Sequence, residues 1–80
     1  SHVFQLLKTV IKFPEWSAKE LSEFTSVSLE NVQGFLSGVE EGDAAALSDY
    51  VRNEMLVDVN LKKEEEVELE KLIRQLLSEA

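Results

Sequence analysis

Carboxylates are the most abundant side chains here that could do chemistry: the 80-residue sequence has 16 Asp and Glu residues, one histidine and no cysteine. The lack of cysteine excludes disulfides, thiolate metal sites and thiol nucleophiles, and it suits a reducing intracellular compartment. The one histidine is His2, which we assign to the remnant of a cleaved tag. The sequence therefore offers no histidine for general acid or base catalysis and none for a metal site. Carboxylate pairs alone can transfer protons, but so short a chain leaves little room for a ligand pocket of about 300 Å³. The sequence therefore predicts no enzyme activity and no cofactor.

The alternation of Asp58, Asn60 and Lys62 is like the start of a calcium-binding loop. In such loops every second position supplies an oxygen ligand, and a glycine and a closing glutamate follow at fixed distances. Lys62 stands where an oxygen is needed, and neither the glycine nor the glutamate has the required spacing. The three glycines of the chain also form no phosphate-binding pattern. We therefore expect no metal site and no glycine-rich phosphate loop.

Negative charge dominates the sequence, with 8 Lys and Arg residues against 16 acidic ones and a formal net charge of -8. Nucleic acids and anionic membranes attract an excess of cations, so this balance argues against nonspecific binding to either. No run approaches the roughly 20 apolar residues that cross a bilayer, and we expect no membrane association. Hydrophobic residues make up 44% of the chain. This composition predicts one small globular domain over residues 3–80, with Ser1 and His2 as the remnant of a cleaved tag.

The charged and apolar side chains of the sequence are expected on helices, because apolar residues recur three and four positions apart through most of the chain. The expected helices cover about residues 3–13, 18–25, 44–55 and 61–79, with a third helix from about residue 29 to the break at Gly42 and Asp43. Residues 56–61 alternate only in part and have no evident partner strand, so we expect a linker there. The sequence thus predicts an all-α, compact bundle of about five short helices.

Capping residues mark the expected helix boundaries. Ser17 and Glu20 have the spacing of a capping box, in which a hydroxyl and a carboxylate each accept a hydrogen bond from a backbone N–H. Ser28 is expected to cap the third helix. Gly42 and Asp43 are expected to end the third helix and to cap the fourth.

Two roles are open for Trp16, which follows the helix break at Pro14. It is either a structural residue, stapled over Leu21 while Leu21 and Phe24 point inward, or an anchor for a protein partner. A domain this small needs the burial of each aromatic side chain, which favours the structural role.

Gly34, Gly38 and Gly42 recur at every fourth position, which would align them on one helix face. Such a face allows another helix to approach closely, although Gly38 or Gly42 is also suited to end the helix. We assign Gly42 to the helix end. Gly34 is expected on an exposed face, as a candidate contact residue for a partner.

The last predicted helix carries an apolar stripe and an acidic outer face. The stripe consists of Leu61, Leu69, Leu72, Ile73, Leu76 and Leu77. It can close the core of this domain, which the short apolar repeat favours, or it can pair with another chain in a homodimer. Glu70 has favourable helical spacing to Arg74. Residues 41–80 hold 11 acidic and 5 basic residues, against 5 and 3 in residues 1–40, so the C-terminal half suits a basic partner.

The second and third predicted helices are joined by a turn of three to four residues and share a pattern of small and apolar positions. These positions are Leu21, Ser22, Ser26, Val27, Ser28, Val32, Phe35 and Leu36. The pattern, within residues 17–38, resembles the helix-turn-helix motif of DNA-binding regulators, although that family commonly has glycine where Ser26 stands. The resemblance implies a helix-turn-helix-like N-terminal core with residues 28–38 as the recognition helix. It makes Ser28, Asn31 and Gln33 the candidates for DNA contacts.

The charges of that recognition helix oppose DNA binding. No Lys or Arg stands between Lys19 and Arg52, so the helix has no cation of its own for phosphate contacts. Binding to DNA as a transcriptional regulator therefore stays an alternative, as does homodimerisation through the C-terminal helix.

The function that the sequence favours is a non-catalytic protein–protein interaction or assembly module of a larger protein. Its expected site is a hydrophobic groove with acidic surroundings, bordered by the third and last helices, that receives a helix or a peptide. The partner is expected to be a basic or amphipathic helix. The candidate contact residues are Phe35, Leu72, Ile73, Leu76 and Leu77, together with Gly34 and Trp16.

Overall fold

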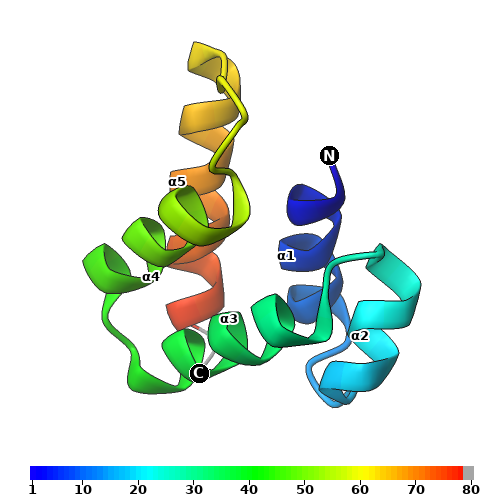
Figure 1. The fold of residues 1–80 in the computed structure, drawn as a ribbon. Helices are drawn as coiled ribbons and strands as arrows, with labels where there is room; N and C mark the ends of the chain where they lie inside the picture. The colour runs from blue at the N-terminus through cyan, green and yellow to red at the C-terminus, as the bar shows by residue number, and fades with distance from the viewer. Residues whose placement is uncertain (79–80) are drawn as a thin grey trace.

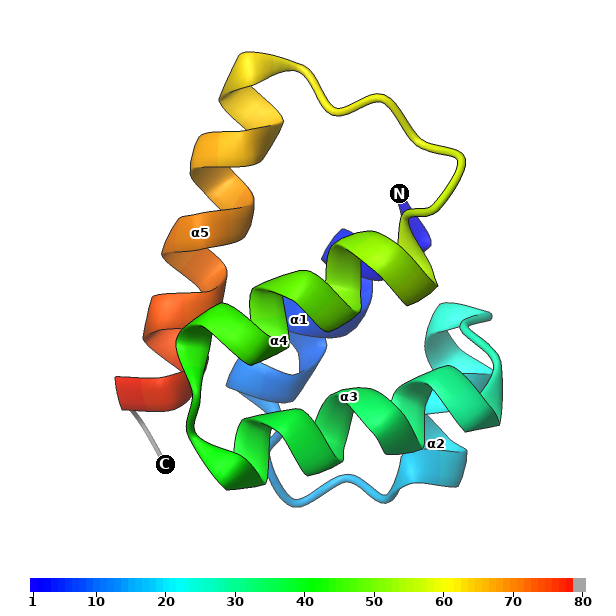
Figure 2. The ribbon, with the colours of Figure 1, turned by 60° about the vertical axis from the view of Figure 1, so that its left-hand side comes forward.

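The chain folds into helices that share one core. The computed structural model describes residues 1–78, and its elements are α1 (His2–Lys12), α2 (Ala18–Thr25), α3 (Leu29–Glu41), α4 (Ala44–Tyr50), the π turn η1 (Val51–Met55) and α5 (Lys63–Ser78). As Figures 1 and 2 show, α1 packs against α2 and α5, α3 packs against α2 and α4, and α4 also contacts α5. No strand occurs within residues 1–78, so the predicted all-α bundle is confirmed. The last residue of the predicted 61–79 helix lies outside the described residues.

The predicted caps define where the helices begin. The backbone N–H of Ser17 donates to Glu20 Oε1 at 2.7 Å and the N–H of Glu20 donates to Ser17 Oγ at 3.1 Å, which completes the capping box. Ser28 and Asp43 each accept a hydrogen bond from the backbone N–H three residues later, at 3.2 and 3.1 Å. Gly42 ends α3 in the left-handed conformation, at φ 76°. These four expectations are confirmed.

Side-chain hydrogen bonds hold the turn between α2 and α3. The Ser22 hydroxyl donates to the Val27 carbonyl at 2.6 Å, and the backbone N–H of Val27 donates to the Thr25 hydroxyl at 3.3 Å. Between them Ser26 adopts φ 64° and ψ 17°, and it is the one non-glycine residue at positive φ in the described chain. A side chain makes this left-handed conformation unfavourable, because Cβ crowds the following carbonyl.

We expect Ser26→Gly to raise the free energy of unfolding by about 0.5–1 kcal/mol, since glycine adopts a left-handed helix end without the steric cost of a Cβ. Urea unfolding followed by circular dichroism measures the change. Ser26→Ala is the matched control, because it keeps the Cβ and should leave the stability near that of the parent. A glycine variant less stable than the parent would contradict the backbone argument.

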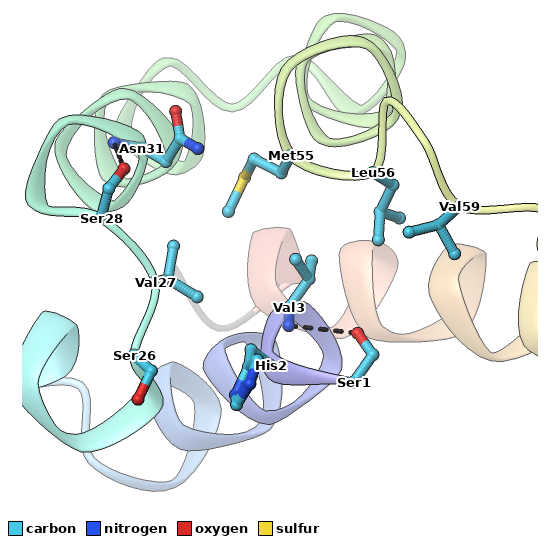
Figure 3. A pocket seen from close by; sticks show the side chains of 10 residues that line it. All are labelled: Ser1, His2, Val3, Ser26, Val27, Ser28, Asn31, Met55, Leu56 and Val59. Carbon is cyan, nitrogen blue, oxygen red and sulfur yellow. Dashed lines mark hydrogen bonds between the residues drawn. The ribbon is translucent and has the colours of Figure 1, made fainter.

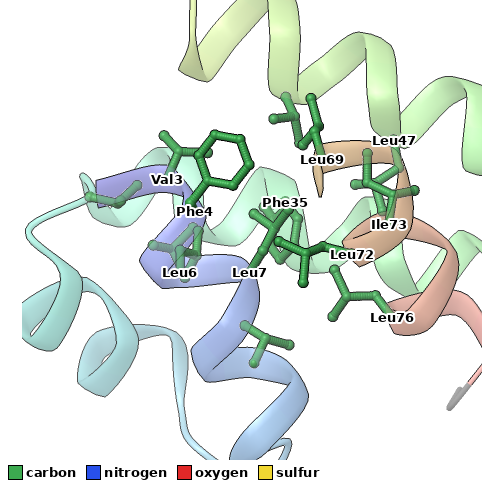
Figure 4. Packing of buried hydrophobic residues seen from close by; sticks show 14 of the residues in the cluster. Val3, Phe4, Leu6, Leu7, Phe35, Leu47, Leu69, Leu72, Ile73 and Leu76 are labelled. Atoms are coloured by element: carbon green, nitrogen blue, oxygen red, sulfur yellow. The ribbon is translucent and has the colours of Figure 1, made fainter. Parts of the chain in front are cut away.

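Buried residues from all five helices form a single hydrophobic core (Figure 4). Leu6 and Leu7 of α1, Phe35 of α3 and Leu69 of α5 have no exposed surface. Further core residues are Val3, Phe4, Val10, Leu21, Val27, Val32, Leu47, Val51, Leu56, Leu72, Ile73 and Leu76. The apolar stripe of α5 therefore closes the core of its own chain.

The predicted helix 44–55 is interrupted by the wider turn η1. The N–H of Leu56 donates to the Val51 carbonyl five residues earlier, at 2.9 Å. The buried residues Leu47, Val51 and Leu56 are accordingly spaced by four and then by five. Leu56 thus takes the core position that a regular α-helix would have given to Met55. Residues 57–62 contain neither helix nor strand, which confirms the expected linker.

An ion-pair cluster fastens α5 to α4 and η1. Arg52 Nη1 lies 2.8 Å from Glu66 Oε1, and Arg52 Nη2 lies 2.5 Å from Glu70 Oε2. The Ser48 hydroxyl donates to Glu70 and accepts from Arg52 Nε, both at 3.2 Å. Glu70 therefore pairs across the helices with Arg52, and not along its own helix with Arg74 as its spacing suggested.

Candidate functional site

Four of the residues predicted to line a binding groove belong to the core: Phe35, Leu72, Ile73 and Leu76. Phe35 is fully buried, and Ile73 and Leu72 are exposed by only 1% and 8%. The physical reason is that α5 packs against both α1 and α4, and these two contacts cover the apolar stripe of α5. Leu77 is half-buried and packs at the edge of the core. Phe35, Leu72 and Ile73 are therefore structural residues, and their placement on an open surface was wrong.

A groove does run between α3 and α5, with the end of α1 as its third wall. Its volume is about 290 Å³ and it is lined by Val10, Ile11, Pro14, Leu36, Val39, Glu40 and Leu76. We call it the α1–α3–α5 groove. Leu76 is the one lining residue that the sequence nominated, and its exposed fraction is only 4%. The α1 residues were missed because an amphipathic pattern does not say which neighbour leaves the edge of its apolar face uncovered.

The walls of this groove keep apolar surface that the folded chain does not cover. Ile11, Leu36 and Val39 are half-buried and pack on the core from the outside. Glu40 is the charged member of the described lining and is exposed. Because no Lys or Arg belongs to α3, this carboxylate gives the rim of the groove a negative charge.

Gly34 serves a contact inside the chain. A Cβ at this position would overlap the Tyr50 phenol of α4, and a Cβ at Gly38 would lie 2.9 Å from Leu47 Cδ1. The two glycines thus form the α3 surface on which α4 packs closely. The prediction that Gly34 lies on an exposed face, as a contact for a partner, is wrong because Tyr50 covers it.

Trp16 lies at the centre of an aromatic cluster at the start of α2. Its ring stacks on Phe13, with centroids 4.7 Å apart and an interplanar angle of 7°, and meets Phe24 edge-on at 5.4 Å and 86°. Trp16 is half-buried against the core, in keeping with a structural role. Phe24, however, is 55% exposed and does not point inward as predicted.

The candidate DNA-contacting residues sit on the first turns of α3. Ser28 caps the helix, Asn31 is half-buried and Gln33 is exposed. Figure 3 shows Ser28 and Asn31 beside a hollow of about 370 Å³, facing Met55 across it. The hollow is lined by Ser1, His2, Val3, Ser26, Val27, Ser28, Asn31, Met55, Leu56 and Val59. Without a Lys or Arg in this lining, the phosphate contacts that DNA binding needs are not supplied here.

The acidic run at the start of α5 is largely engaged within the chain. Glu65 Oε1 accepts a hydrogen bond from the Lys62 backbone N–H at 2.8 Å, which caps the helix. Glu66 pairs with Arg52, and Glu68 pairs with Lys8 of α1 at 3.3 Å. These carboxylates therefore stabilise α5 and its attachment to α1 and η1.

Within residues 1–78, no group of three or more His, Cys, Asp or Glu side chains is placed to hold a metal ion. None of the helices in the same part of the chain is long and apolar enough to span a membrane. Comparisons with protein-family models, curated proteins and solved structures found no match to the chain. The geometry of its surface is thus the basis for any functional argument.

Proposed function

We propose that this domain is a non-catalytic protein–protein interaction or assembly module of a larger protein, and that the α1–α3–α5 groove receives an amphipathic helix. The observation that supports this most directly is the groove itself, an apolar cleft bounded by three core helices with one carboxylate on its rim. Helix-in-groove recognition uses such a cleft to bury the apolar side chains of one helix face.

The size and the walls of the groove suit anchoring side chains better than a small molecule. At about 290 Å³ it is at the lower limit of small-molecule pockets, which span roughly 300–1,000 Å³. Val10 and Leu76 are fixed in the core, so little ordering of the walls opposes binding. Each partner leucine that becomes fully buried here would contribute about 1.5–3 kcal/mol.

The negative charge of the domain favours a partner helix that carries a basic residue. Glu40 lies on the rim, and the chain as a whole carries a net charge of -8. A basic residue next to the apolar face of the partner helix would be steered toward the domain and would pair with Glu40. The partner is therefore an amphipathic helix with Lys or Arg flanking its leucines.

We expect Glu40→Lys to reverse the preference between two designed helical peptides that share leucine positions and differ only in Lys or Glu flanks. The parent protein should bind the Lys peptide, and the variant should bind the Glu peptide, because the charge at the rim has changed sign. Titration of ¹⁵N-labelled protein measures this, with the largest shifts expected at Ile11, Leu36 and Val39.

Glu41→Lys is the matched control, since Glu41 is the neighbouring exposed carboxylate on α3 and does not line the groove. It should leave the peptide preference unchanged. Shifts that map elsewhere, or equal effects of the two variants, would contradict the groove assignment. Salt-sensitive binding of a random DNA duplex with shifts at Ser28 and Gln33 would instead favour the helix-turn-helix alternative.

A further inference from the structure

A second hollow of about 390 Å³ opens on the surface of α2 and is lined by Trp16, Glu20, Glu23 and Phe24. It shares no lining residue with the α1–α3–α5 groove. Trp16 and Phe24 meet edge to face at 86° with centroids 5.4 Å apart, so the two rings contact each other and together form one aromatic side of the hollow. Two carboxylates complete the lining. This combination of aromatic rings and negative charge is suited to hold a cation, because the face of an aromatic ring attracts positive charge.

The lining is held in place before any ligand arrives. Trp16 stacks on Phe13 at 4.7 Å, which limits the rotation of the indole. The carboxylate of Glu20 is tied by the capping box to the start of α2. Hydrogen bonding to the backbone N–H and the side chain of Ser17 lowers the pKa of Glu20, so this carboxylate is negative at neutral pH.

The aromatic cluster already accommodates one cation of this chain, on the side of Phe13. Lys12 Nζ lies over the Phe13 ring, 5.5 Å from its centroid. At the Trp16–Phe24 end, none of the ion pairs in residues 1–78 involves Glu20 or Glu23. Lys8 and Lys12 line a separate hollow with Phe13 and Phe24. No Lys or Arg is among the described residues that line the hollow with Trp16, Glu20 and Glu23.

We propose that the hollow lined by Trp16, Glu20, Glu23 and Phe24 binds the guanidinium group of an arginine side chain from a basic protein segment. A planar guanidinium stacks on aromatic rings and donates N–H groups along two edges. In this hollow it can lay one face against the exposed aromatic surface and direct its edges toward the carboxylates of Glu20 and Glu23. Lysine lacks the planar face, and a trimethylammonium group has no N–H to donate to the carboxylates.

The test titrates ¹⁵N-labelled protein with a capped Gly-Gly-Arg-Gly-Gly peptide. Trp16 is the sole tryptophan of the sequence, so its indole N–H gives one assigned signal inside the site. The arginine peptide should produce saturable shifts at this signal and at the amides of α2, with a dissociation constant on the order of millimolar. The peptide in which neutral citrulline replaces arginine should produce none, and lysine and trimethyllysine peptides should bind more weakly.

Two variants test the lining without disturbing the core. Glu23 is exposed and its side chain makes none of the described hydrogen bonds, so Glu23→Gln should leave the fold intact. It should lower the affinity for the arginine peptide roughly fivefold to tenfold. Phe24→Leu keeps an apolar side chain but removes the ring, and it should weaken binding as well. Glu64→Gln is the matched control, because it removes an exposed carboxylate on α5, which lies across the molecule from α2 (Figure 1).

Equal shifts with the citrulline peptide would overturn the proposal, because recognition would then not depend on the cation. Equal weakening by Glu23→Gln and Glu64→Gln would also overturn it, since that result means diffuse attraction to an acidic protein. Stronger binding of the trimethyllysine peptide than of the arginine peptide would also overturn the proposal, because the hollow would then prefer a quaternary ammonium group to a guanidinium. These outcomes do not depend on the α1–α3–α5 groove, so either proposal can fail while the other stands.

Discussion

Phe35→Ala is expected to lower the free energy of unfolding by about 3–5 kcal/mol. Phe35 is the largest of the fully buried side chains, and Figure 4 shows it beside Leu7 of α1 and Leu72 of α5. Removing the ring loses its burial and leaves a cavity that the packed helices can only partly fill. Because small domains are stable by only about 5–15 kcal/mol, much of the stability of this domain would be lost. Urea unfolding measures the effect.

Phe24→Ala is the matched control for that experiment, since it makes the same chemical change at a side chain that is 55% exposed. Its effect on stability should stay below about 1 kcal/mol. The pair separates two interpretations of Phe35 directly. A Phe35→Ala variant as stable as Phe24→Ala would contradict the core assignment and would return Phe35 to the candidate binding residues.

Truncation after Asn60 is expected to abolish cooperative folding. The deletion removes α5 and with it Leu69, Leu72, Ile73 and Leu76, all of which are buried in the core. Burial of four such side chains contributes roughly 6–12 kcal/mol, which is comparable to the whole stability of a small domain. The ion pairs of Arg52 and Lys8 with α5 are lost at the same time. Circular dichroism and the dispersion of a ¹⁵N spectrum measure the outcome.

Addition of a peptide with residues 61–80 provides the control, because it should restore the dispersed spectrum of the truncated chain by rebuilding the same core. The homodimer hypothesis makes the opposite prediction. It requires that residues 1–60 stay folded as a monomer and that the intact chain self-associates through α5. The mass of both proteins at several concentrations distinguishes the two cases.

The starts of α2, α3 and α4 could be predicted from the sequence because they depend on chemistry within a few residues. The start of α1 was missed, since Ser1, assigned to a tag, caps the helix that begins at His2, and α5 begins at Lys63 and not at residue 61. Ser17, Ser28 and Asp43 each accept a hydrogen bond from a backbone N–H three residues later, and Gly42 takes the left-handed conformation that suits glycine. None of these interactions requires knowledge of how the helices pack.

The candidate site could be predicted only as a location between α3 and α5. The spacing of Phe24 and Phe35 places each on an apolar stripe, yet one is over half exposed and the other fully buried. The difference arises from the neighbours: residues of α1 and α5 pack beside Phe35, whereas none of the described core residues covers the exposed side of Phe24. Gly34 is another case, because its role depends on Tyr50, which the chain places against it from a different helix. Periodicity identifies a face but not the element that covers it.

The extra residue in η1 also affects how this chain should be aligned with other sequences. Each residue turns an α-helix by about 100°, so a regular helix keeps one face when core residues are four apart. Here Val51 and Leu56 are five apart, and the π turn absorbs the excess. A sequence one residue shorter between these positions could form an unbroken α-helix and still fill both core sites. An alignment of such a sequence therefore needs a single gap within residues 52–55, because without it every position of α5 would be matched one residue out of phase.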